Sequence, residues 1–386
     1  MPASIRHLRM FMTLGRTNSV TRTAEINHVS QPAVTQAMAK LTRECGHALF
    51  RRSPQGLFLT EAGELLHARA TRALRMLDAA TTDMHHAIRV QATWQQLLSL
   101  VAVTETESFT LAAHRLGLAQ PTVHRSTTLL EEAAGAVFFQ RTVHGMISTR
   151  PALQLAQAAR LALAELDQAE SDMATLDGRE VGRIVIGALP LSRSGWLPRA
   201  ILAFRKLRPN FPFHVIDGRY DELLLGLRRG EIDMMLGALR LPTPIEDIAQ
   251  ERLFDDEVVA VARRDHPLMA RAKVEFQDLV AHPWVMPRRS TPLRGILDAF
   301  FAERSPADVI ETSSVIMMRE ILRESDYLGG LSRMQAEVEA EVLSILPITL
   351  PNAMRPIGVT IRKGWEPTRA QQDFLDLLRK TAAQLA

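Results

Sequence analysis

The sequence predicts tandem, mainly α-helical winged helix-turn-helix modules with long linker helices, followed by a two-lobed α/β domain. Three observations predict this fold class. A capped helix that begins near Ser30 precedes a strand–turn–strand segment, the chain repeats itself with an offset of 89 residues, and strands alternate with helices from Arg179 onward. A fixed period of similar residues indicates a duplicated module, and alternating strands and helices are typical of α/β sheets.

The best-defined local signal is the start of a helix at Ser30. Its hydroxyl can accept a hydrogen bond from a free N–H of the first turn, and Pro32 fits in that turn because its missing N–H would have no partner. Val34, Met38 and Leu41 recur at helical spacing and are expected to pack inward. The opposite, polar face carries Gln31, Thr35, Gln36 and Lys40.

Two interpretations of this polar face are open. Flat amide side chains near a helix N-terminus suit the DNA major groove, where Gln pairs with adenine. A solvated helix face has the same composition, and the face alone favours that plainer interpretation. Its surroundings favour the groove, because residues 19–26 are expected to form a shorter helix, a tight turn follows, and residues 49–60 are expected to form two short strands around a Pro/Gly turn.

Together these elements resemble the N-terminal region of the LysR-type transcriptional regulators. The resemblance rests on four stretches in the family's order, Ala24-Glu25, Ser30-Gln31-Pro32-Ala33-Val34, Leu49-Phe50-Arg51-Arg52 and Leu59-Thr60-Glu61-Ala62-Gly63. Asn27 departs from the family's usual leucine, between the first helix and the second. By this resemblance, DNA contacts are expected at Ser30, Gln31, Pro32, Thr35, Gln36, Lys40, Arg51 and Arg52.

Length and composition set the outer limits. With 386 residues, 46% of them hydrophobic, the chain can bury more than one core. It has no apolar run of about eighteen residues, and Arg6, Arg9 and Arg16 interrupt its start, so we expect no membrane span and no signal peptide and place the protein in the cytoplasm. The single cysteine, Cys45, excludes an internal disulfide and is expected to be a small buried residue.

The chain contains two copies of one module. A shift of 89 positions superposes the helices and the strand pair, so that Gln31-Pro32 falls on Gln120-Pro121. We therefore expect copy one at residues 1–90 and copy two at residues 91–178. The equivalent recognition positions of copy two, whose contact with DNA the sequence leaves open, are Gln120, His124, Arg125 and Arg141.

Charge separates the two copies. Copy one holds 12 Lys and Arg against 6 Asp and Glu, net +6, whereas copy two holds 5 against 9, net −4. DNA affinity comes largely from the release of counterions around phosphates, so copy one is the better equipped to bind. Copy two also has Ala119 in place of the capping Ser30. We expect copy two to serve mainly as a packing partner; weak DNA contact by copy two is the alternative.

Each copy ends in a long amphipathic segment with an apolar seam at spacings of four and three, which predicts helices about 40 Å long. The seam of copy one holds Leu66, Ala70, Ala73, Leu77, Ala80, Met84 and Ala87. The seam of copy two holds Leu155, Ala159, Ala162, Leu166, Ala169, Met173 and Leu176. The resemblance implies a dimerisation helix here, and we expect the two seams to pair within the chain. Packing of each helix against its own module is the alternative.

The strands and helices after Arg179 are typical of a parallel α/β sheet. A strand at Glu257–Ala262 precedes an expected crossing into a second lobe at Arg263–Pro267, with a return near Leu346-Pro347. Two lobes with two crossings match the effector domain of LysR-type regulators, which is similar to periplasmic binding proteins. We expect an effector domain at 179–386, with lobe I at about 179–264 and 347–386 and lobe II at about 265–346.

Two loops ahead of helices, at residues 189–195 and 287–292, combine hydroxyl and guanidinium groups. Helix N-termini and guanidinium groups bind anions, so a cleft between the lobes is expected to hold a carboxylate, a phosphate or a polyhydroxy ligand. Helix capping by these residues is the plainer interpretation. The candidate effector-binding residues are Ser192, Arg193, Arg288, Ser290, Thr291 and Ser313.

No spacing in the chain matches a phosphate-binding glycine loop, a zinc-protease motif or a nucleophile elbow. We therefore expect no enzyme, no catalytic or metal-binding residue and no cofactor. We expect a ligand-responsive regulator that senses a small anionic or polyhydroxy metabolite and forms a homo-oligomer. Its expected partners are double-stranded DNA and a small-molecule effector, with RNA polymerase as a further candidate and no membrane. A cytoplasmic small-molecule-binding protein or enzyme without operator binding is the alternative.

Overall fold

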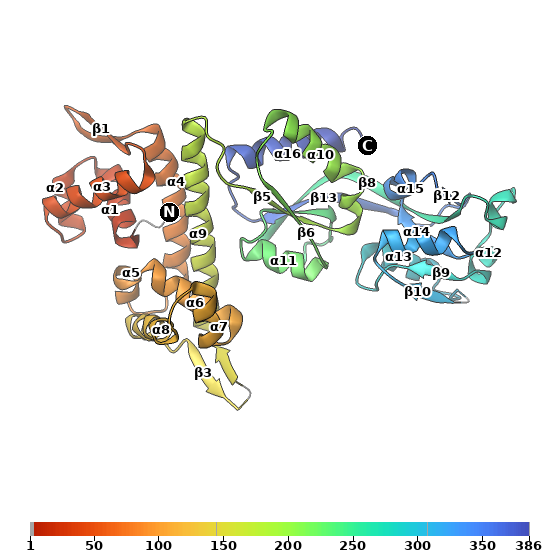
Figure 1. Cartoon of the computed structure of the whole chain (residues 1–386), viewed down its shortest axis with the longest axis horizontal. Coiled ribbons are helices and arrows are strands. Elements are labelled where there is room, and N and C mark those ends of the chain that lie inside the picture. Colours follow the sequence, from red (N-terminus) through yellow and green to blue (C-terminus); the bar gives the residue numbers. More distant parts are fainter. Residues whose placement is uncertain (1–3, 144, 307, 386) are drawn as a thin grey trace. The chain divides into compact units, whose positions relative to one another are not determined.

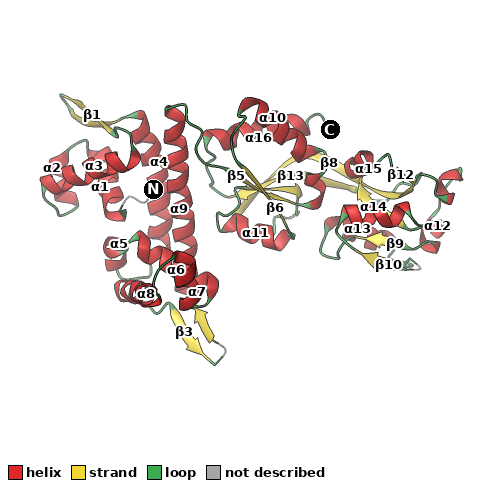
Figure 2. Cartoon of the chain, viewed as in Figure 1, coloured by secondary structure: helices red, strands yellow, loops and turns green. Residues whose placement is uncertain are grey.

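The computed structural model describes residues 4–143, 145–306 and 308–385. The chain divides into two compact units, unit 1 (Met1–Gly182) and unit 2 (Arg183–Ala386). Figures 1 and 2 show unit 1 as helices with two short strand pairs and unit 2 as strands covered by helices. Over the described residues, no helix is long and apolar enough to cross a membrane.

Copy one is a helical module with a two-stranded wing. Its elements are α1 (Ile5–Thr17), α2 (Val20–Ile26), α3 (Gln31–Cys45), β1 (Phe50–Ser53) and β2 (Gly56–Leu59). Ser19 caps α2 by accepting from Arg22 N, and the Ser30 hydroxyl caps α3 by accepting from Ala33 N at 3.4 Å, as the sequence predicts. Gly46 follows α3 in the left-handed conformation, at φ 73°, which favours glycine.

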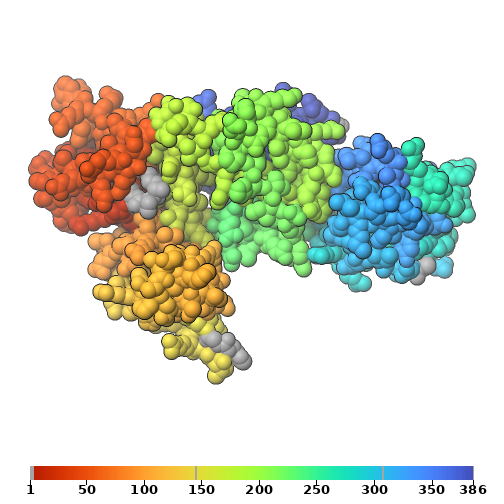
Figure 3. Space-filling view, viewed as in Figure 1, coloured from red at the N-terminus to blue at the C-terminus, as the bar shows by residue number. Residues whose placement is uncertain are grey.

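Copy two repeats these elements after a short helix, α5 (Ala87–Gln91). They are α6 (Trp94–Thr106), α7 (Phe109–Leu116), α8 (Gln120–Ala134), β3 (Phe139–Thr142) and β4 (Gly145–Ser148). Ser108 caps α7, whereas α8 begins after Ala119, which has no side-chain cap to offer. Figure 3 shows the two copies as separate masses within unit 1, copy one in red and most of copy two in amber.

Two long helices pack side by side in unit 1, as the seams predict. They are α4 (Glu61–Ala80) and α9 (Arg150–Leu176). Arg72 of α4 meets Glu165 of α9, whereas Arg69, about one turn earlier in α4, meets Asp172, about two turns later in α9. Residue numbers therefore rise along one helix as they fall along the other, and the pair is antiparallel.

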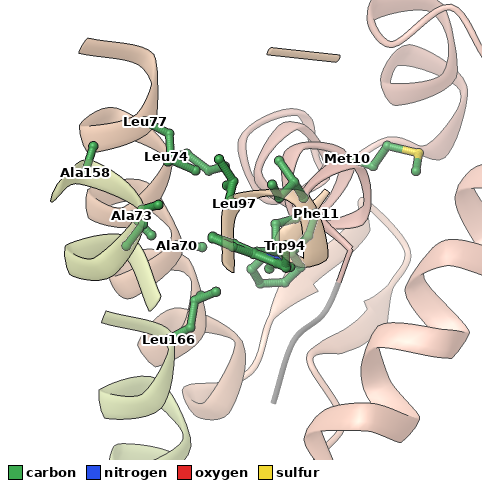
Figure 4. Packing of buried hydrophobic residues seen from close by; sticks show 14 of the residues in the cluster. Met10, Phe11, Ala70, Ala73, Leu74, Leu77, Trp94, Leu97, Ala158 and Leu166 are labelled. Atoms are coloured by element: carbon green, nitrogen blue, oxygen red, sulfur yellow. The ribbon is translucent and has the colours of Figure 1, made fainter. Parts of the chain in front are cut away.

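The interface between α4 and α9 is built around small side chains. Ala70, Ala73, Ala159 and Ala162 are fully buried, and alanine lets two helix backbones come close. Figure 4 shows Ala70 and Ala73 near Leu166. Side chains of both copies and of both long helices form one continuous hydrophobic core. The second module is therefore part of the same folded body as the first.

The linker helix of copy one is shorter than its seam predicts. α4 has 20 residues and ends at Ala80, so the last two expected seam positions, Met84 and Ala87, lie beyond it. The chain has to turn here to enter copy two, and His85 N donates to Ala134 O at the end of α8. At 1.5 Å per residue, α4 is about 30 Å long, while the 27 residues of α9 reach the expected length of about 40 Å.

A buried ion network crosses the interface between α4 and α9. Arg69, which is 3% exposed, lies 2.8 Å from Asp172 and donates to Gln168 at 2.6 Å. Its third partner is Glu165, at 3.3 Å, which also accepts from Arg72 at 2.8 Å. Buried charges are stable only when they are paired, so this network favours one register of the two helices.

Replacing Arg69 by alanine should destabilise the helix pair. The change leaves Asp172 and Glu165 short of a partner in a buried place, which costs about 3–5 kcal/mol. Hydrogen exchange of α4 and α9 amides in the full chain measures the loss. Arg75→Ala, at an exposed position of the same helix, is the matched control and should cost less than about 0.5 kcal/mol. Equal protection in both variants would contradict the role given to the network.

Unit 2 is built on a mixed sheet, whose described strands follow the order β10-β9-β11-β8-β13-β7-β5-β6, with β12 beside β8. Its strands are β5 (Ile184–Ala188), β6 (Phe213–Asp217), β7 (Met234–Ala238), β8 (Ile248–Arg263), β9 (Trp284–Met286), β10 (Val309–Glu311), β11 (Leu328–Ser332), β12 (Leu343–Ile345) and β13 (Met354–Arg362). Because β8 and β13 lie in the middle of this order, they join the strands of the two lobes.

Helices cover the strands of both lobes. They are η1 (Pro190–Arg193), α10 (Trp196–Leu207), α11 (Tyr220–Arg228), η2 (Pro267–Ala270), α12 (Phe276–Ala281), α13 (Pro292–Phe300), α14 (Val315–Arg323), α15 (Arg333–Val338) and α16 (Arg369–Ala382). In lobe I, α10 and α16 pack together around Trp196 and Phe374. In lobe II, Trp284 and Leu297 lie in a separate core. Each lobe thus has a hydrophobic core of its own.

The sheet differs from the expected parallel arrangement. β5, β6 and β7 are parallel, as are β9, β10 and β11, but β8 and β13 run antiparallel to their neighbours. Residues 248–257 of β8 pair with β13, and residues 258–263 pair with β11 and β12. The chain therefore changes lobe inside β8, not at Arg263–Pro267 as expected. The first part of β8 is half-exposed and charged, so it lacks the apolar run from which a buried strand is predicted.

Candidate nucleic-acid interface and ligand cleft

The polar face of α3 is exposed, and its apolar face is buried. The exposed positions are Ser30, Gln31, Pro32, Thr35, Gln36 and Lys40. Thr35 donates to the main-chain oxygen of Gln31 at 3.1 Å, and Lys40 lies 3.8 Å from Glu44. The amide groups of Gln31 and Gln36 therefore lie on an exposed surface at the start of a helix, with a lysine on the same helix. This arrangement has the chemistry for reading base edges beside a phosphate.

The wing adds two exposed arginines in β1. Successive side chains of a strand point to opposite faces, so Arg51 and Arg52 cannot both serve the same surface. The guanidinium of Arg51 lies over the ring of Phe58, 5.7 Å from its centroid. Arg52 pairs across the wing with Leu57, on the other face. Either guanidinium can bind a phosphate, but one at a time from a given side.

In copy two the recognition positions are also exposed, but the surface around them has changed. The exposed positions are Gln120, His124, Arg125 and Arg141. Leu129, which is 44% exposed, occupies the position of Lys40, and Leu111, which is 59% exposed, occupies that of Arg22. Leucine can neither hold a phosphate nor release a counterion, so the cationic chemistry of this surface in copy one is only partly present in copy two.

A cleft of about 580 Å³ opens in unit 2. Five of the six predicted effector residues line it, namely Arg193, Arg288, Ser290, Thr291 and Ser313. The sixth, Ser192, does not line the cleft. It is fully buried in η1, and its hydroxyl donates to Leu189 O at 2.8 Å, which corrects the expectation that it touches a ligand. The local turn, which the sequence pattern did not show, points this side chain inward.

Some of the predicted residues have structural partners as well. Thr291 caps α13, accepting from Arg294 N at 3.2 Å and donating to Arg288 O at 2.9 Å. Arg193 lies 3.3 Å from Asp217 across the exposed rim of the cleft. The plainer interpretation, helix capping, therefore holds for the hydroxyl of Thr291. The guanidinium groups are the better candidates for contact with a ligand.

Among the lining residues that were not predicted from the sequence are Tyr220, Arg240 and Arg355. Arg240 places its guanidinium over the ring of Tyr220, 4.5 Å from the centroid, and donates to Ser290 O at 2.8 Å. Arg355 is 7% exposed and lies 3.3 Å from the buried carboxylate of Asp256. Burial lowers the pKa of Arg355, but arginine stays charged in proteins.

These three side chains share an unusual feature. The Tyr220 hydroxyl, Arg240 Nε and Arg355 Nε are buried and have no hydrogen-bond partner among the described residues. A buried donor without a partner costs about 1–3 kcal/mol. Leu239 N donates to Pro356 O next to the ladder of β7 and β13, so the two arginines lie on neighbouring segments. All three side chains line the cleft, which makes them candidates for contact with a bound anion.

The charge of the lining favours an anion. Its basic residues are Arg193, Arg219, Arg240, Arg288 and Arg355, and its acidic residues are Asp217 and Glu222. Guanidinium groups bind carboxylate and phosphate oxygens in pairs of hydrogen bonds. Desolvation raises the pKa of Tyr220, which keeps its hydroxyl a donor. No local motif could have pointed to Arg240 and Arg355, because distant parts of the sequence come together only through strand pairing.

Comparison with protein families agrees with this organisation. The model described as LysR substrate binding domain matches residues 177–383. The model described as bacterial regulatory helix-turn-helix protein, lysR family, matches twice, at residues 5–64 and 94–153. Both copies of the module are therefore recognised, together with unit 2.

Curated relatives span the chain to different extents. The HTH-type transcriptional regulator GalR of Pseudomonas putida is 32% identical over 99% of this chain and 98% of its own length. The HTH-type transcriptional regulator PcaQ of Agrobacterium fabrum is 27% identical over 76% of this chain and 96% of its own length. The part of this chain that PcaQ leaves unmatched is close to the size of one module.

Solved structures show the same fold. A full-length OxyR variant of Pseudomonas aeruginosa has a TM-score of 0.55 at 19% identity, covering 76% of this chain and 95% of its own. CbnR, a LysR family transcriptional regulator, has a TM-score of 0.53 at 19% identity, covering 75% of this chain and 99% of its own. CbnR has also been solved in complex with its target DNA.

Proposed function

Because the chain belongs to the LysR family of transcriptional regulators, we propose that copy one reads operator DNA and that a small anion in the cleft of unit 2 changes this binding. The observation that carries the proposal is a basic winged module in one chain with an arginine-lined cleft. We take residues 1–90, 91–178 and 179–386 as the two modules and the effector domain. From family membership we further propose that the protein acts in the cytoplasm. Its further proposed partners are RNA polymerase and other copies of the chain.

Copy one would read DNA with the exposed face of α3. Gln31, Thr35 and Gln36 have the donors and acceptors that recognise base edges, and Lys40 is a phosphate ligand near them. Ser30 and Pro32 shape the start of the helix, and Arg51 or Arg52 would hold phosphate at the wing. The net charge of +6 in residues 1–90 supplies the counterion release that drives such binding.

Substitutions in copy one should separate base reading from phosphate binding. Gln36→Ala should cost about 1–3 kcal/mol at particular base pairs, whereas Arg52→Ala should weaken all sequences and flatten the salt dependence. Gel retardation with DNA from the neighbourhood of the protein's own gene, followed by base substitution in the bound site, measures both. Arg75→Ala, exposed on α4, is the control. A Gln36 variant with unchanged base preference would show that another residue reads the bases.

Copy two would act mainly as a packing partner for copy one, a role that we call a brace. Its net charge is −4, and exposed leucines stand at two positions where copy one has cations. The ring of His124 also packs against Phe109, with centroids 5.0 Å apart, so one of its four recognition side chains already has a contact within the module. Gln120, Arg125 and Arg141 keep groups that could bind DNA, and weak or sequence-restricted contact by copy two is the alternative.

The triple variant Gln120→Ala, His124→Ala and Arg125→Ala decides between brace and reader. If copy two is a brace, operator affinity should change by less than about threefold, since surface changes of this kind cost only a few tenths of a kcal/mol each. The matched triple variant of copy one, Gln31→Ala, Thr35→Ala and Gln36→Ala, should lose at least about tenfold. Comparable losses in both triple variants would make copy two a second reader.

The cleft would bind a small carboxylate or phosphate. Unpartnered donors on Tyr220, Arg240 and Arg355 support this class, because each has a hydrogen to donate and two carry a fixed positive charge. Arg240 bonds to Ser290 in lobe II and follows β7 in lobe I, so a ligand that engages its guanidinium would affect both lobes. Such a ligand would shift the balance between arrangements of the lobes rather than undergo chemistry.

Thermal stabilisation of the full chain by panels of small carboxylates, phosphates and neutral sugars tests this class, since a bound ligand raises apparent stability. We expect anions to stabilise the chain and sugars to have no effect. Arg240→Met should weaken the best anion at least about tenfold, because a charged hydrogen bond is lost while the apolar stem remains. Arg264→Met, exposed and away from the cleft lining, should not. Unchanged affinity in Arg240→Met would place the ligand elsewhere.

A further inference from the structure

The direction of α9 decides which copy lies beside the chain's exit from unit 1. α4 starts in copy one and α9 starts in copy two, and the two helices run antiparallel. The last turns of α9 therefore lie beside copy one, about 40 Å from the start of the helix in copy two. Burial raises the pKa of Cys45, at the end of α3, to about 11, and the charge of Glu170 in α9 adds to this rise. The end of α3, the recognition helix of the proposed function, is thus close to the end of α9.

One contact joins these two helix ends. His47, the second residue after α3, places Nε2 3.1 Å from a carboxylate oxygen of Asp177, the first residue after α9. At this distance the two groups form an ion pair when the imidazole is protonated, and Nε2 has no hydrogen-bond partner among the described residues. Its other nitrogen, Nδ1, lies 3.0 Å from Cys45 O, so one side of the imidazole is held by its own turn while the other side faces Asp177. A hydrogen bond from Arg179 lowers the pKa of Asp177 and keeps the carboxylate charged.

The segment that leaves α9 is also fastened to it. The Ser171 hydroxyl donates to Val181 O at 2.6 Å, so the chain folds back along the last turn of the helix. Gly182 has a φ of +104°, and a Cβ there would come within 2.8 Å of Ser171 Oγ. Residues 177–182, which lead into unit 2, are therefore tied to α9 at one end and to the recognition helix at the other.

Comparison of the two copies shows that the contact between His47 and Asp177 has no equivalent at the matching positions, Ala136 and Ile88. The residue of copy two that corresponds to His47 is Ala136, which has no imidazole. The residue of copy one that corresponds to Asp177 is Ile88, which is 1% exposed in α5 and carries no charge. The two copies share their helices and wings, so the loss of similarity here singles out a contact that packing of the module alone does not require.

We propose that His47 and Asp177 are positioning residues that couple the effector domain to the recognition helix of copy one. The inference rests on the proposed function, because it assigns the route by which a ligand in unit 2 changes DNA binding. A displacement of residues 178–182 moves Asp177. Through the contact with His47, it also acts on the turn at Gly46, which follows α3. Copy two lacks the equivalent side chain and is bypassed. By reciprocity, DNA bound to α3 must change the state of residues 178–182.

This reciprocity gives the test, which needs no knowledge of the effector. The full chain is mixed with a DNA duplex selected from random sequences for tight binding, and amide hydrogen exchange of residues 178–182 is compared with and without the duplex. We expect the duplex to slow this exchange about fivefold in the parent chain, and the difference to disappear in Asp177→Asn and in His47→Gln. The comparison of bound with free protein within each variant cancels any static loosening of the segment.

Two further variants sharpen the result. Asp177→Glu keeps the charge and should restore the response, and Arg179→Ala removes the other partner of Asp177 and should leave it intact. A response that persists in Asp177→Asn, or is absent from the parent chain although the duplex binds, would overturn the coupling. An equal loss in Arg179→Ala would overturn the role of His47. A chain that binds no duplex would instead refute the proposed function, and the coupling with it.

Discussion

Unit 1 depends on the antiparallel packing of α4 against α9. Fully buried alanines allow the two backbones to approach, and the pairing of Arg69 with Asp172 and Glu165 favours one register. Because the helices run in opposite directions, the two winged modules lie at opposite ends of the pair (Figure 1). Their spacing is therefore set by two packed helices rather than by a flexible linker, and buried side chains of both modules are continuous with this interface.

Unit 2 depends in a similar way on two strands that join its lobes. β8 pairs with strands of both lobes, and Asp256 and Arg355 form a buried pair beside the place where it passes from one to the other. An ion pair in such a position is costly to desolvate and is a poor source of stability by itself. Arg355 of this pair lines the arginine-rich cleft in which we propose that an anion binds.

Much of this architecture could be predicted from the sequence, because it depends on local chemistry. The Ser30 cap, the helical spacing of the seams and the repeat are all encoded by neighbouring residues or by fixed offsets. The rest depends on contacts between distant residues. Arg240 and Arg355 come to neighbouring segments through strand pairing, and the hydroxyl of Ser192 turns inward in a short 3-10 helix. α4 ends before its seam does because the chain turns there to enter copy two. A regular apolar spacing in the sequence does not predict that turn.

The fusion of two paired modules in one polypeptide also changes the thermodynamics of assembly. Two chains that pair through linker helices associate in proportion to their concentration, whereas α4 and α9 meet at the effective concentration set by the intervening residues. Dilution therefore cannot separate this pair, and exchange of partners with a related regulator cannot scramble it. Each module is also free to acquire substitutions that its partner does not share. A homodimer with identical halves lacks that freedom. The opposite net charges of the two copies are the result of such independent substitutions.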